Sequence, residues 1–331
     1  MAPSRIPGFE LAFNHDGFGL LEELANTAMT EDDAARVLVE PLIGSAITVL
    51  DWCILTTGQH NCRTRHGRGF AGDGQGRECD RLIGRVVAHY NAQPNDLLDI
   101  VIRRGHDAGL KVLGNIRLNH GALNTERLLS CPGRNAGNKK DFQDPAFHVF
   151  LAELAEDLLV KGVDGLSLDF ERKAPFFPAD APDRERTEAC VNFLRRIRGL
   201  TSKPIVVRVS HQPEKGRPQG QDPETWLAEG LVDVVVPATH NHEPDPLDWG
   251  FVRFLEAAAR SPRPCQVWPQ IWPTASAWAA REHSSHTPEA IHRRVADLRA
   301  RGAHGAYFFN FCCYGTRSEY FPMFKTLAAN R

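Results

Sequence analysis

The chain has 331 residues, of which 42% are hydrophobic and 24% charged. These fractions are typical of a folded globular protein and exclude a largely disordered chain. Lys and Arg number 39 against 41 Asp and Glu, so the chain lacks the basic excess that nucleic acids or anionic membrane surfaces require. There is no run of about 18 apolar residues and no secretory signal, which predicts a soluble, cytoplasmic protein that does not enter membranes.

The eight cysteines are scattered and form no CxxC pair. We therefore expect reduced, mostly buried thiols and not a disulfide framework. The adjacent residues Cys312 and Cys313 leave a redox or metal role open, but ordinary packing is the interpretation we adopt. No cofactor is predicted, and the sequence gives no indication of the oligomeric state.

Eight short apolar, β-branched segments recur along the chain with helical segments between them. The predicted strands are Phe9–Asn14, Ala46–Cys53, Lys111–Leu118, Gly165–Phe170, Pro204–Val209, Val232–Pro237, Cys265–Ile271 and Ala306–Phe311. Alternation of strand and helix favours a parallel sheet, and eight units favour its closure into a (β/α)₈ TIM barrel. We expect a single α/β domain over residues 1–331.

The connections support this topology. Helix starts are expected near Thr30, Asn95, Asp144, Asp222 and Thr287, where an N-cap oxygen precedes proline or acidic residues. Four helices are predicted to end at a left-handed glycine, namely Gly109, Gly162, Gly230 and Gly302. The loops that leave the strands are much longer than those that enter them. Because barrel enzymes carry their chemistry on such strand-to-helix loops, we expect the functional site at that rim.

The most informative segment is the fourth strand, Asp164–Arg172. Alternation places Ser167, Asp169 and Glu171 on the barrel interior, climbing towards the rim. Two interior carboxylates suit acid/base catalysis, because burial and mutual repulsion separate their pKa values. Alternatively, Glu171 pairs with an arginine merely to close the top of the barrel.

The segment Asp164-Gly-Leu-Ser-Leu-Asp169-Phe-Glu171 resembles the strand-four signature of family 18 glycoside hydrolases, Asp-Gly-x-Asp-x-Asp-x-Glu. The resemblance implies that Glu171 is a general acid. The chain departs from that signature at Ser167, where the family has Asp, and no Tyr-Asp pair follows the sixth strand. These departures argue against substrate-assisted chemistry of the chitinase type.

Most of the chain also resembles bacterial family 10-like glycosyl hydrolase-related barrel proteins. The similarity lies in Leu50-Asp-Trp-Cys53, Asn115-Ile-Arg-Leu-Asn119, Gly165–Phe177, Asp222–Asp233 and Gly305–Phe311. It implies a TIM-type barrel with carbohydrate hydrolase activity, and it implies little about the substrate.

Polar residues at the upper ends of other strands are the predicted substrate-binding groups. They are Asn14, Asp51, Arg117, Asn119, Arg208 and Asn310. A guanidinium or amide beside the carboxylates would hold sugar hydroxyls through fixed donors. The alternative is that Arg117 or Arg208 only neutralises Asp169 inside the barrel.

The loop after the sixth strand contains His240, His242, Glu243 and Asp245. The two histidines are predicted to bind substrate, and Glu243 or Asp245 is the alternative second carboxylate of a glycosidase pair. A divalent metal held by the histidines is the less favoured interpretation.

The seventh strand contributes two tryptophans and a glutamine. Trp268 and Trp272 share strand parity and are predicted to line the sugar cleft. Gln270 stands where many retaining barrel glycosidases have their nucleophilic Glu, which removes the simplest two-glutamate mechanism.

Together these features predict a glycoside hydrolase acting on an oligo- or polysaccharide. Glu171 would be the general acid, partly shielded by the following Phe176 and Phe177, and Asp169 the nucleophile or electrostatic partner. A metal-dependent barrel hydrolase or lyase and a catalytically silent carbohydrate-binding barrel remain as alternatives.

Overall fold

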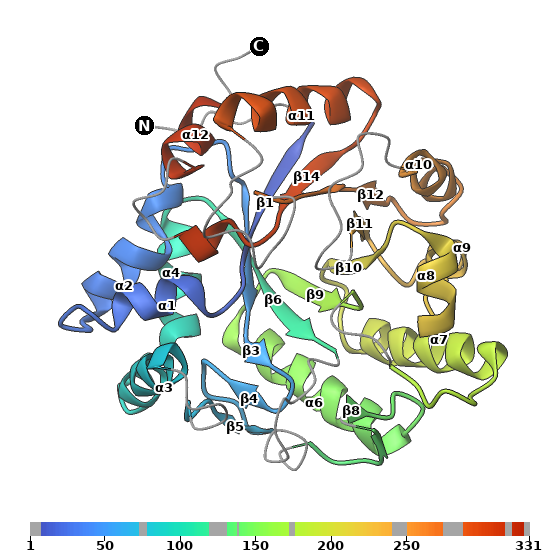
Figure 1. Ribbon diagram of the computed structural model, residues 1–331, viewed down its shortest axis with the longest axis horizontal. Coiled ribbons are helices and arrows are strands. Elements are labelled where there is room, and N and C mark those ends of the chain that lie inside the picture. The colour runs from blue at the N-terminus through green and yellow to red at the C-terminus, as the bar shows by residue number, and fades with distance from the viewer. Residues whose placement is uncertain are drawn as a thin grey trace.

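The computed structural model describes residues 8–72, 78–118, 131–137, 139–171, 176–239, 250–273, 287–314 and 320–327. A parallel sheet lies at its centre, with helices around it (Figure 1). The sheet order is β12-β11-β10-β9-β6-β2-β1-β14-β13. In chain order the strands are β1 (Glu10–His15), β2 (Val49–Cys53), β6 (Lys111–Arg117), β9 (Gly165–Asp169), β10 (Ile205–Ser210), β11 (Val234–Ala238), β12 (Gln266–Val267), β13 (Gln270–Ile271) and β14 (Gly305–Phe308).

The two outer members of this order, β12 and β13, are halves of one predicted strand. β12 pairs with β11, and β13 pairs with β14. Pro269 separates them because it has no N–H to donate to a ladder. Its carbonyl nevertheless accepts from the N–H of Tyr307 at 3.1 Å, and the N–H of Trp268 donates to the carbonyl of Val235 at 3.0 Å. The segment thus bonds to both neighbours, and the sheet closes into the predicted (β/α)₈ barrel.

Most strand ends lie within two residues of the sequence prediction, and two differ from it by three residues. β2 begins at Val49, three residues later than predicted, and β14 ends at Phe308 instead of Phe311. β14 ends early because Asn310 has a positive φ of 62° and a 3₁₀ helix begins at Phe311. Short strands inside the long loops were not predicted: β3 (Leu55–Thr56), β4 (Gln59–His60), β5 (Arg68–Gly69), β7 (Asn135–Ala136) and β8 (Lys139–Lys140).

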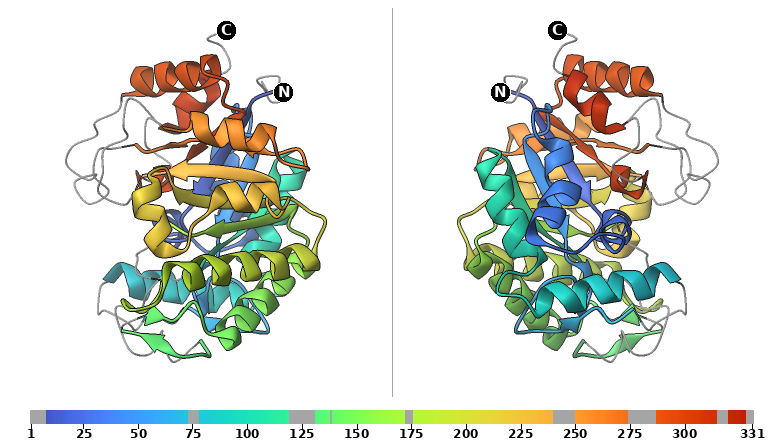
Figure 2. Two further views of the ribbon diagram at one scale, coloured as in Figure 1. Left: turned by 90° about the vertical axis from the view of Figure 1, so that its right-hand side faces the viewer. Right: turned by 90° about the vertical axis from the view of Figure 1, so that its left-hand side faces the viewer.

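Helices lie along the outside of the sheet, as the side views show (Figure 2). They are α1 (Gly19–Leu24), α2 (Glu31–Leu38), α3 (Glu78–Asn91), α4 (Leu97–Asp107), α6 (Pro145–Lys161), α7 (Asp183–Leu200), α8 (Pro213–Gly216), α9 (Pro223–Ala228), α10 (Val252–Ala259), α11 (Pro288–Ala300) and α12 (Tyr320–Thr326). The 3₁₀ helices are η1 (Glu40–Leu42), η2 (Arg217–Gln219) and η4 (Phe311–Tyr314). No helix in the described part of the chain is both long and apolar enough to cross a membrane.

The predicted helix ends are confirmed with one shift. The side chains of Thr30, Asp144, Asp222 and Thr287 cap α2, α6, α9 and α11, and the cap of α4 is Asp96, not the neighbouring Asn95. The four predicted terminal glycines all have a positive φ, between 65° and 100°. Their left-handed backbone turns the chain at once into the next strand.

The apolar core has two parts. A large cluster fills the layer between sheet and helices, and a smaller one lies inside the barrel. The inner cluster comprises Ala12, Val49, Leu113, Val206, Val234, Val236, Trp268, Trp272, Tyr307 and Phe309. The polar residues of β1, β2, β6, β9 and β10 follow these side chains along the same inward face, towards the carboxyl ends of the strands. On these five strands the inward face is therefore apolar below and polar above. A single domain over 1–331 and a cytoplasmic location stay predictions.

Candidate active site

The register of β9 places Asp169 between two arginines. Its Cα partner on β6 is Arg117, and its Cα partner on β10 is Arg208. All three side chains are on the inward face and at most 2% exposed. A buried carboxylate is costly unless a cation or hydrogen bonds compensate it. The two neighbouring strands provide these cations, because Arg117 and Arg208 lie beside Asp169 in the sheet register.

Asp169 is fixed by two donors on one oxygen. Nη1 of Arg208 donates to Oδ1 of Asp169 at 2.8 Å, and the backbone N–H of Glu171 donates to the same oxygen at 3.0 Å. Arg208 is fixed in turn, because its Nε donates to Oε1 of Gln270 at 2.6 Å and its guanidinium lies 3.9 Å from the ring centre of Phe309. Nη2 of Arg208 is buried and has no hydrogen-bond partner among the described residues. Arg208 thus neutralises Asp169 inside the barrel, which is the alternative that the sequence left open.

Glu171 lies two residues beyond Asp169, just after the end of β9. It is 7% exposed, and its backbone N–H is tied to Asp169. The expected shield differs from the structure. Phe176 and Phe177 pack against Phe142 in the layer between sheet and helices, with ring centres 5.5 and 6.0 Å from its ring. Both rings therefore belong to the core between sheet and helices.

Below these carboxylates, a polar network is centred on Asp51. Oδ2 of Asp51 accepts from Nδ2 of Asn14 at 3.1 Å, from Nδ2 of Asn115 at 2.8 Å and from the hydroxyl of Ser167 at 3.2 Å. The hydroxyl of Tyr307 donates to the same oxygen. Members of the network come from β1, β2, β6, β9 and β14. It therefore fastens five strands together beneath the mouth of the barrel.

Burial controls the protonation of this network. It raises the pKa of Asp51 from its ordinary value to about 6, although the hydrogen bonds from Tyr307, Asn115, Asn14 and Ser167 act in the opposite direction. Burial and the neighbouring Asp51 also raise the pKa of Tyr307 well above its usual range. Asp51 and Asn14 are at most 1% exposed. Their side chains therefore lie beneath the site and bond to each other, whereas the sequence predicted that they contact the substrate.

Arg117 has contacts on the side away from Arg208. Its Nη1 donates to the carbonyl of Leu55 at 3.1 Å, and its Nη2 lies 4.0 Å from Oδ2 of Asp16. Burial works to lower the pKa of Arg117, but neighbouring negative groups, Asp16 and Asp169 among them, raise it above its usual value. Arg117 therefore remains a fixed cation between two acidic side chains.

The remaining predicted residues lie in three kinds of place. Trp268 is 5% exposed near the lower end of the barrel, where its Nε1 donates to Oε1 of Gln266 at 2.8 Å, so it fills the interior instead of the mouth. Trp272 packs on Phe309 with ring centres 4.9 Å apart, and Asn310 follows the end of β14. Asn119, His240, His242, Glu243 and Asp245 lie outside the described residues.

Sequence reasoning missed two partners of the site. Tyr307 and Gln270 both point inward. Gln270 has the strand parity of the predicted Trp268 and Trp272, whereas Tyr307 has the parity opposite to that of Asn310, the residue of this strand that was expected to face inward. The available signal was a hydroxyl and an amide at inward positions of two otherwise apolar strands. A buried polar side chain at such a position needs a partner across the barrel.

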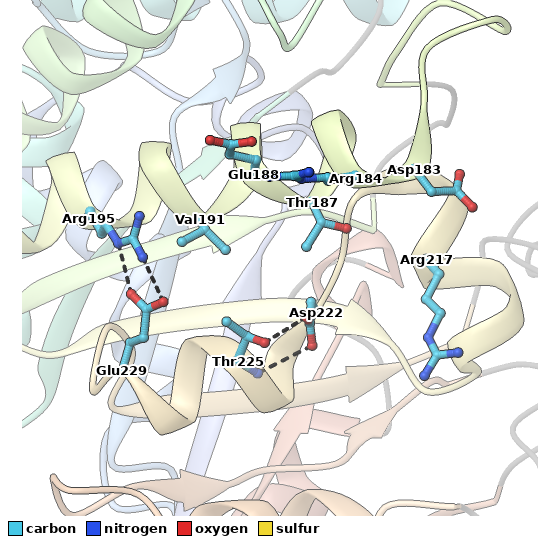
Figure 3. A pocket seen from close by; sticks show the side chains of 10 residues that line it. All are labelled: Asp183, Arg184, Thr187, Glu188, Val191, Arg195, Arg217, Asp222, Thr225 and Glu229. Atoms are coloured by element: carbon cyan, nitrogen blue, oxygen red, sulfur yellow. Dashed lines mark hydrogen bonds and ion pairs between the residues drawn. The ribbon is translucent and has the colours of Figure 1, made fainter.

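A separate hollow of about 640 Å³ lies on the outer surface, between α7 and α9 (Figure 3). Two pairs of its polar side chains bond to each other. Arg195 forms a two-pronged ion pair with Glu229, at 2.7 and 2.8 Å, and Asp222 bonds to Thr225 as the helix cap. The hollow is formed by helix side chains and shares none of the inward carboxylates, so we do not place the chemistry there.

No protein-family model matches the chain, and no curated protein matches it in sequence. Solved structures with a similar fold include the chitinase ChiW of Paenibacillus sp. str. FPU-7, at a TM-score of 0.58 and 10% identity over 97% of this chain. The chain spans about a third (33%) of that multi-modular enzyme. Also similar is the C-terminal domain of a putative chitinase from Desulfitobacterium hafniense DCB-2, at 0.52 and 11% over 97% of this chain and 99% of that one.

A third similar structure is a glycoside hydrolase family 18 N-acetylglucosaminidase from Paenibacillus barengoltzii. It matches at a TM-score of 0.52 and 11% identity, over 97% of this chain and 99% of that one. At such identities the likeness concerns the fold, which is that of barrels found among glycoside hydrolases. The resemblance to family 10-like proteins stays a prediction.

Proposed function

We propose that the chain is a glycoside hydrolase, with Glu171 as general acid and Asp169 as its charged partner. The observation that carries this proposal is the placement of Asp169, an inward carboxylate at the carboxyl end of β9 that bonds to Arg208, with Glu171 two residues further on, just after the strand. Cleavage of a glycosidic bond needs a proton donor for the leaving group and a negative charge near the sugar cation. The pair offers both kinds of group.

The contacts of Asp169 favour an electrostatic and positioning role over nucleophilic attack. One of its oxygens already accepts from Arg208 and from the N–H of Glu171. Donated hydrogen bonds withdraw electron density from a carboxylate and make it a weaker nucleophile. The same N–H contact fixes the backbone from which the Glu171 side chain extends, so Asp169 would orient the acid as well.

The second reacting carboxylate would come from the loop after β11. The seventh strand has Gln270, which accepts a hydrogen bond from Arg208, at the position where many retaining barrel glycosidases have their nucleophilic Glu. This strand therefore provides no carboxylate there. Glu243 and Asp245 are the candidates for a base or nucleophile, as the sequence predicts.

The fold guides the choice of substrates. Barrels of similar topology belong to chitinases and to an N-acetylglucosaminidase. Chitin oligosaccharides are therefore the first substrates to test. Other glycans belong in the same panel, because Ser167 departs from the family 18 signature at the position where that family has Asp.

The test compares wild type with Glu171→Gln and Asp169→Asn on natural oligosaccharides and on aryl glycosides with activated leaving groups. We expect Glu171→Gln to lower kcat on oligosaccharides by about 10²- to 10⁴-fold and to spare the aryl substrates, which need little proton donation. Asp169→Asn should slow both classes, because it removes charge from the transition state in each. Glu156→Gln, at an exposed position of α6, is the matched control and should leave both rates unchanged.

Each alternative has its own result. Undiminished cleavage of an identified glycan by Glu171→Gln would contradict the assignment of the acid and direct attention to Glu243 or Asp245. Glycan binding by the wild type without any product would identify a silent carbohydrate-binding barrel. Loss of activity with a chelator would instead favour the metal-dependent hydrolase or lyase.

A further inference from the structure

Two cysteines and one aspartate meet at the rim where the first and last strands end. Asp16 follows β1, and Cys312 and Cys313 lie in η4, just after β14. Sγ of Cys312 donates to Oδ1 of Asp16 at 3.4 Å, and Sγ of Cys313 donates to Oδ2 at 3.5 Å. The residues are far apart in sequence and adjacent only because β1 pairs with β14.

The separations match those between ligands of a tetrahedral metal ion. Zinc binds thiolate sulfur at about 2.3 Å and carboxylate oxygen at about 2.0–2.2 Å, so a sulfur and an oxygen on one zinc ion lie about 3.5 Å apart. One ligand atom from each of the three residues lies within 4.8 Å of the others. We propose that Asp16, Cys312 and Cys313 form a binding site for a thiophilic divalent cation such as Zn²⁺.

The charges around the cluster are suited to this occupant. A divalent cation would replace the two thiol protons, so that two thiolates and one carboxylate carry three negative charges against two positive ones. The remaining negative charge faces the guanidinium of Arg117, whose Nη2 lies 4.0 Å from Asp16. Binding therefore introduces no uncompensated charge at a buried rim, and it releases two protons to solvent.

The carboxylate is already oriented by the backbone. Its Oδ1 accepts from the N–H groups of Phe18 and Gly19, at 2.8 and 3.3 Å. Gly19 also allows η4 to approach, since a Cβ at this position would lie 2.5 Å from the carbonyl oxygen of Cys312. Hydrogen bonds of this kind hold a ligand in place before the metal arrives.

The fourth ligand position would be open to solvent. Asp16 and Cys312 are buried at 6% and 0% exposure, whereas Cys313 is exposed. A cation bound from that side keeps room for water or a substrate oxygen, as in metal sites with three protein ligands. The site is distinct from the histidine pair considered in the sequence, because its ligands come from the rim at β1 and β14.

The test is a Zn²⁺ titration of the reduced, metal-free full chain against a chromophoric chelator. The wild type should bind one Zn²⁺ at submicromolar concentration, with release of about two protons near pH 7. Cys313→Ser and Asp16→Asn should each weaken binding by about a hundredfold or more, since even partners of metal ligands contribute about ten- to a hundredfold. Cys265→Ser is the matched control, because Cys265 is a partly buried thiol before β12 at the opposite end of the barrel, and it should bind zinc like the wild type.

Two results would overturn the proposal: zinc affinity in Cys313→Ser equal to that of the wild type, or zinc binding without proton release. Cys313 is exposed, so its replacement should not unfold the chain, and urea unfolding of each variant checks this point. The experiment is independent of catalysis, so its outcome does not depend on whether the chain cleaves glycans.

Discussion

At the scale of single residues, the interior of the barrel is governed by the cost of burying charge. Asp51 is fully buried and accepts four hydrogen bonds on one oxygen, yet burial still raises its pKa to about 6. Four donors on Oδ2 do not replace the hydration that both oxygens have in water. The protonated form is therefore stabilised in the folded chain relative to the unfolded one.

Asp51→Asn should consequently change stability in a pH-dependent way. Between about pH 4 and pH 6 the folded state binds a proton that the unfolded state has lost, so the free energy of unfolding of the wild type falls as the pH rises. Two pKa units correspond to about 3 kcal/mol. We expect the variant to gain up to about that amount relative to the wild type between pH 4 and pH 7, measured by urea unfolding at both pH values.

The control for this measurement is Tyr307→Phe, which removes one donor to Asp51 but keeps the carboxyl group. It should leave the pH dependence in place or steepen it, because one opposing hydrogen bond is lost. A difference between Asp51→Asn and wild type that is the same at pH 4 and pH 7 would contradict the raised pKa.

Strand parity predicted the inward residues well and their partners poorly. Asp169, Arg117, Arg208 and Asp51 all face inward, as alternation requires. Which of them touch depends on the stagger between strands, which alternation does not determine. That is why the sequence left open whether Arg117 or Arg208 pairs with Asp169, and why the hydrogen bond that Arg208 donates to Gln270 was missed.

At the scale of elements, one side chain of α6 fastens the loop after β2. Asp157 accepts from the backbone N–H of Arg65 at 2.7 Å, from its Nε at 2.5 Å and from the N–H of His66 at 3.3 Å. The loop forms the small sheet β3-β4-β5. Asp157 is only 5% exposed, so the carboxylate itself is largely shielded from water, although the side chain of Arg65 is 66% exposed.

Asp157→Ala should release this part of the loop without unfolding the barrel. A hydrogen bond to a charged group contributes about 1.5–3 kcal/mol, so we expect the amide of Arg65 to exchange its hydrogen at least about tenfold faster. Hydrogen exchange measured on peptides covering residues 60–70 tests this directly. Glu156→Ala, at the exposed neighbouring position, should leave the exchange unchanged, and an equal rate in Asp157→Ala would show that the carboxylate does not hold the loop.

Helix ends were predicted where a local signal exists, and loop strands were not. A capping oxygen or a left-handed glycine acts within a few residues, so Thr30 and Gly162 can be recognised in the sequence. The pairing of β4 with β5 instead depends on contacts such as those of Asp157, which lies about ninety residues further along the chain. No local pattern carries that information.

At the scale of the whole molecule, closure of the barrel creates neighbours that sequence order conceals. The pairing of β1 with β14 brings Asp16 to Cys312 and Cys313 across almost the entire chain. A closed eight-stranded barrel implies that its first and last strands pair. The sequence thus predicted that the ends of the first and last strands lie side by side. It did not predict the 3₁₀ helix that turns both thiols towards one carboxylate.

The same closure makes the last strand sensitive to added volume. Gly305 begins β14, where a Cβ would lie 2.4 Å from the carbonyl oxygen of Glu10 and 2.6 Å from Cδ1 of Trp268. The backbone of Glu10 and the indole of Trp268 cannot both move away from an added Cβ. The segment around Pro269 pairs with β11 on one side and β14 on the other, which holds both groups in place. Gly305→Ala should therefore lower the free energy of unfolding by about 1–3 kcal/mol, the usual cost of overpacking.

Urea unfolding measures this loss, and Gly199→Ala provides the matched control. Gly199 is exposed on α7, and a Cβ there meets nothing within 4 Å. The control should raise stability by up to about 1 kcal/mol through helix propensity alone. Because β14 is part of a closed sheet, the loss in Gly305→Ala should appear as a shift of the whole transition with its slope retained. Unchanged stability in Gly305→Ala would mean that the seam between β1, β14 and the seventh strand has room the structure does not show.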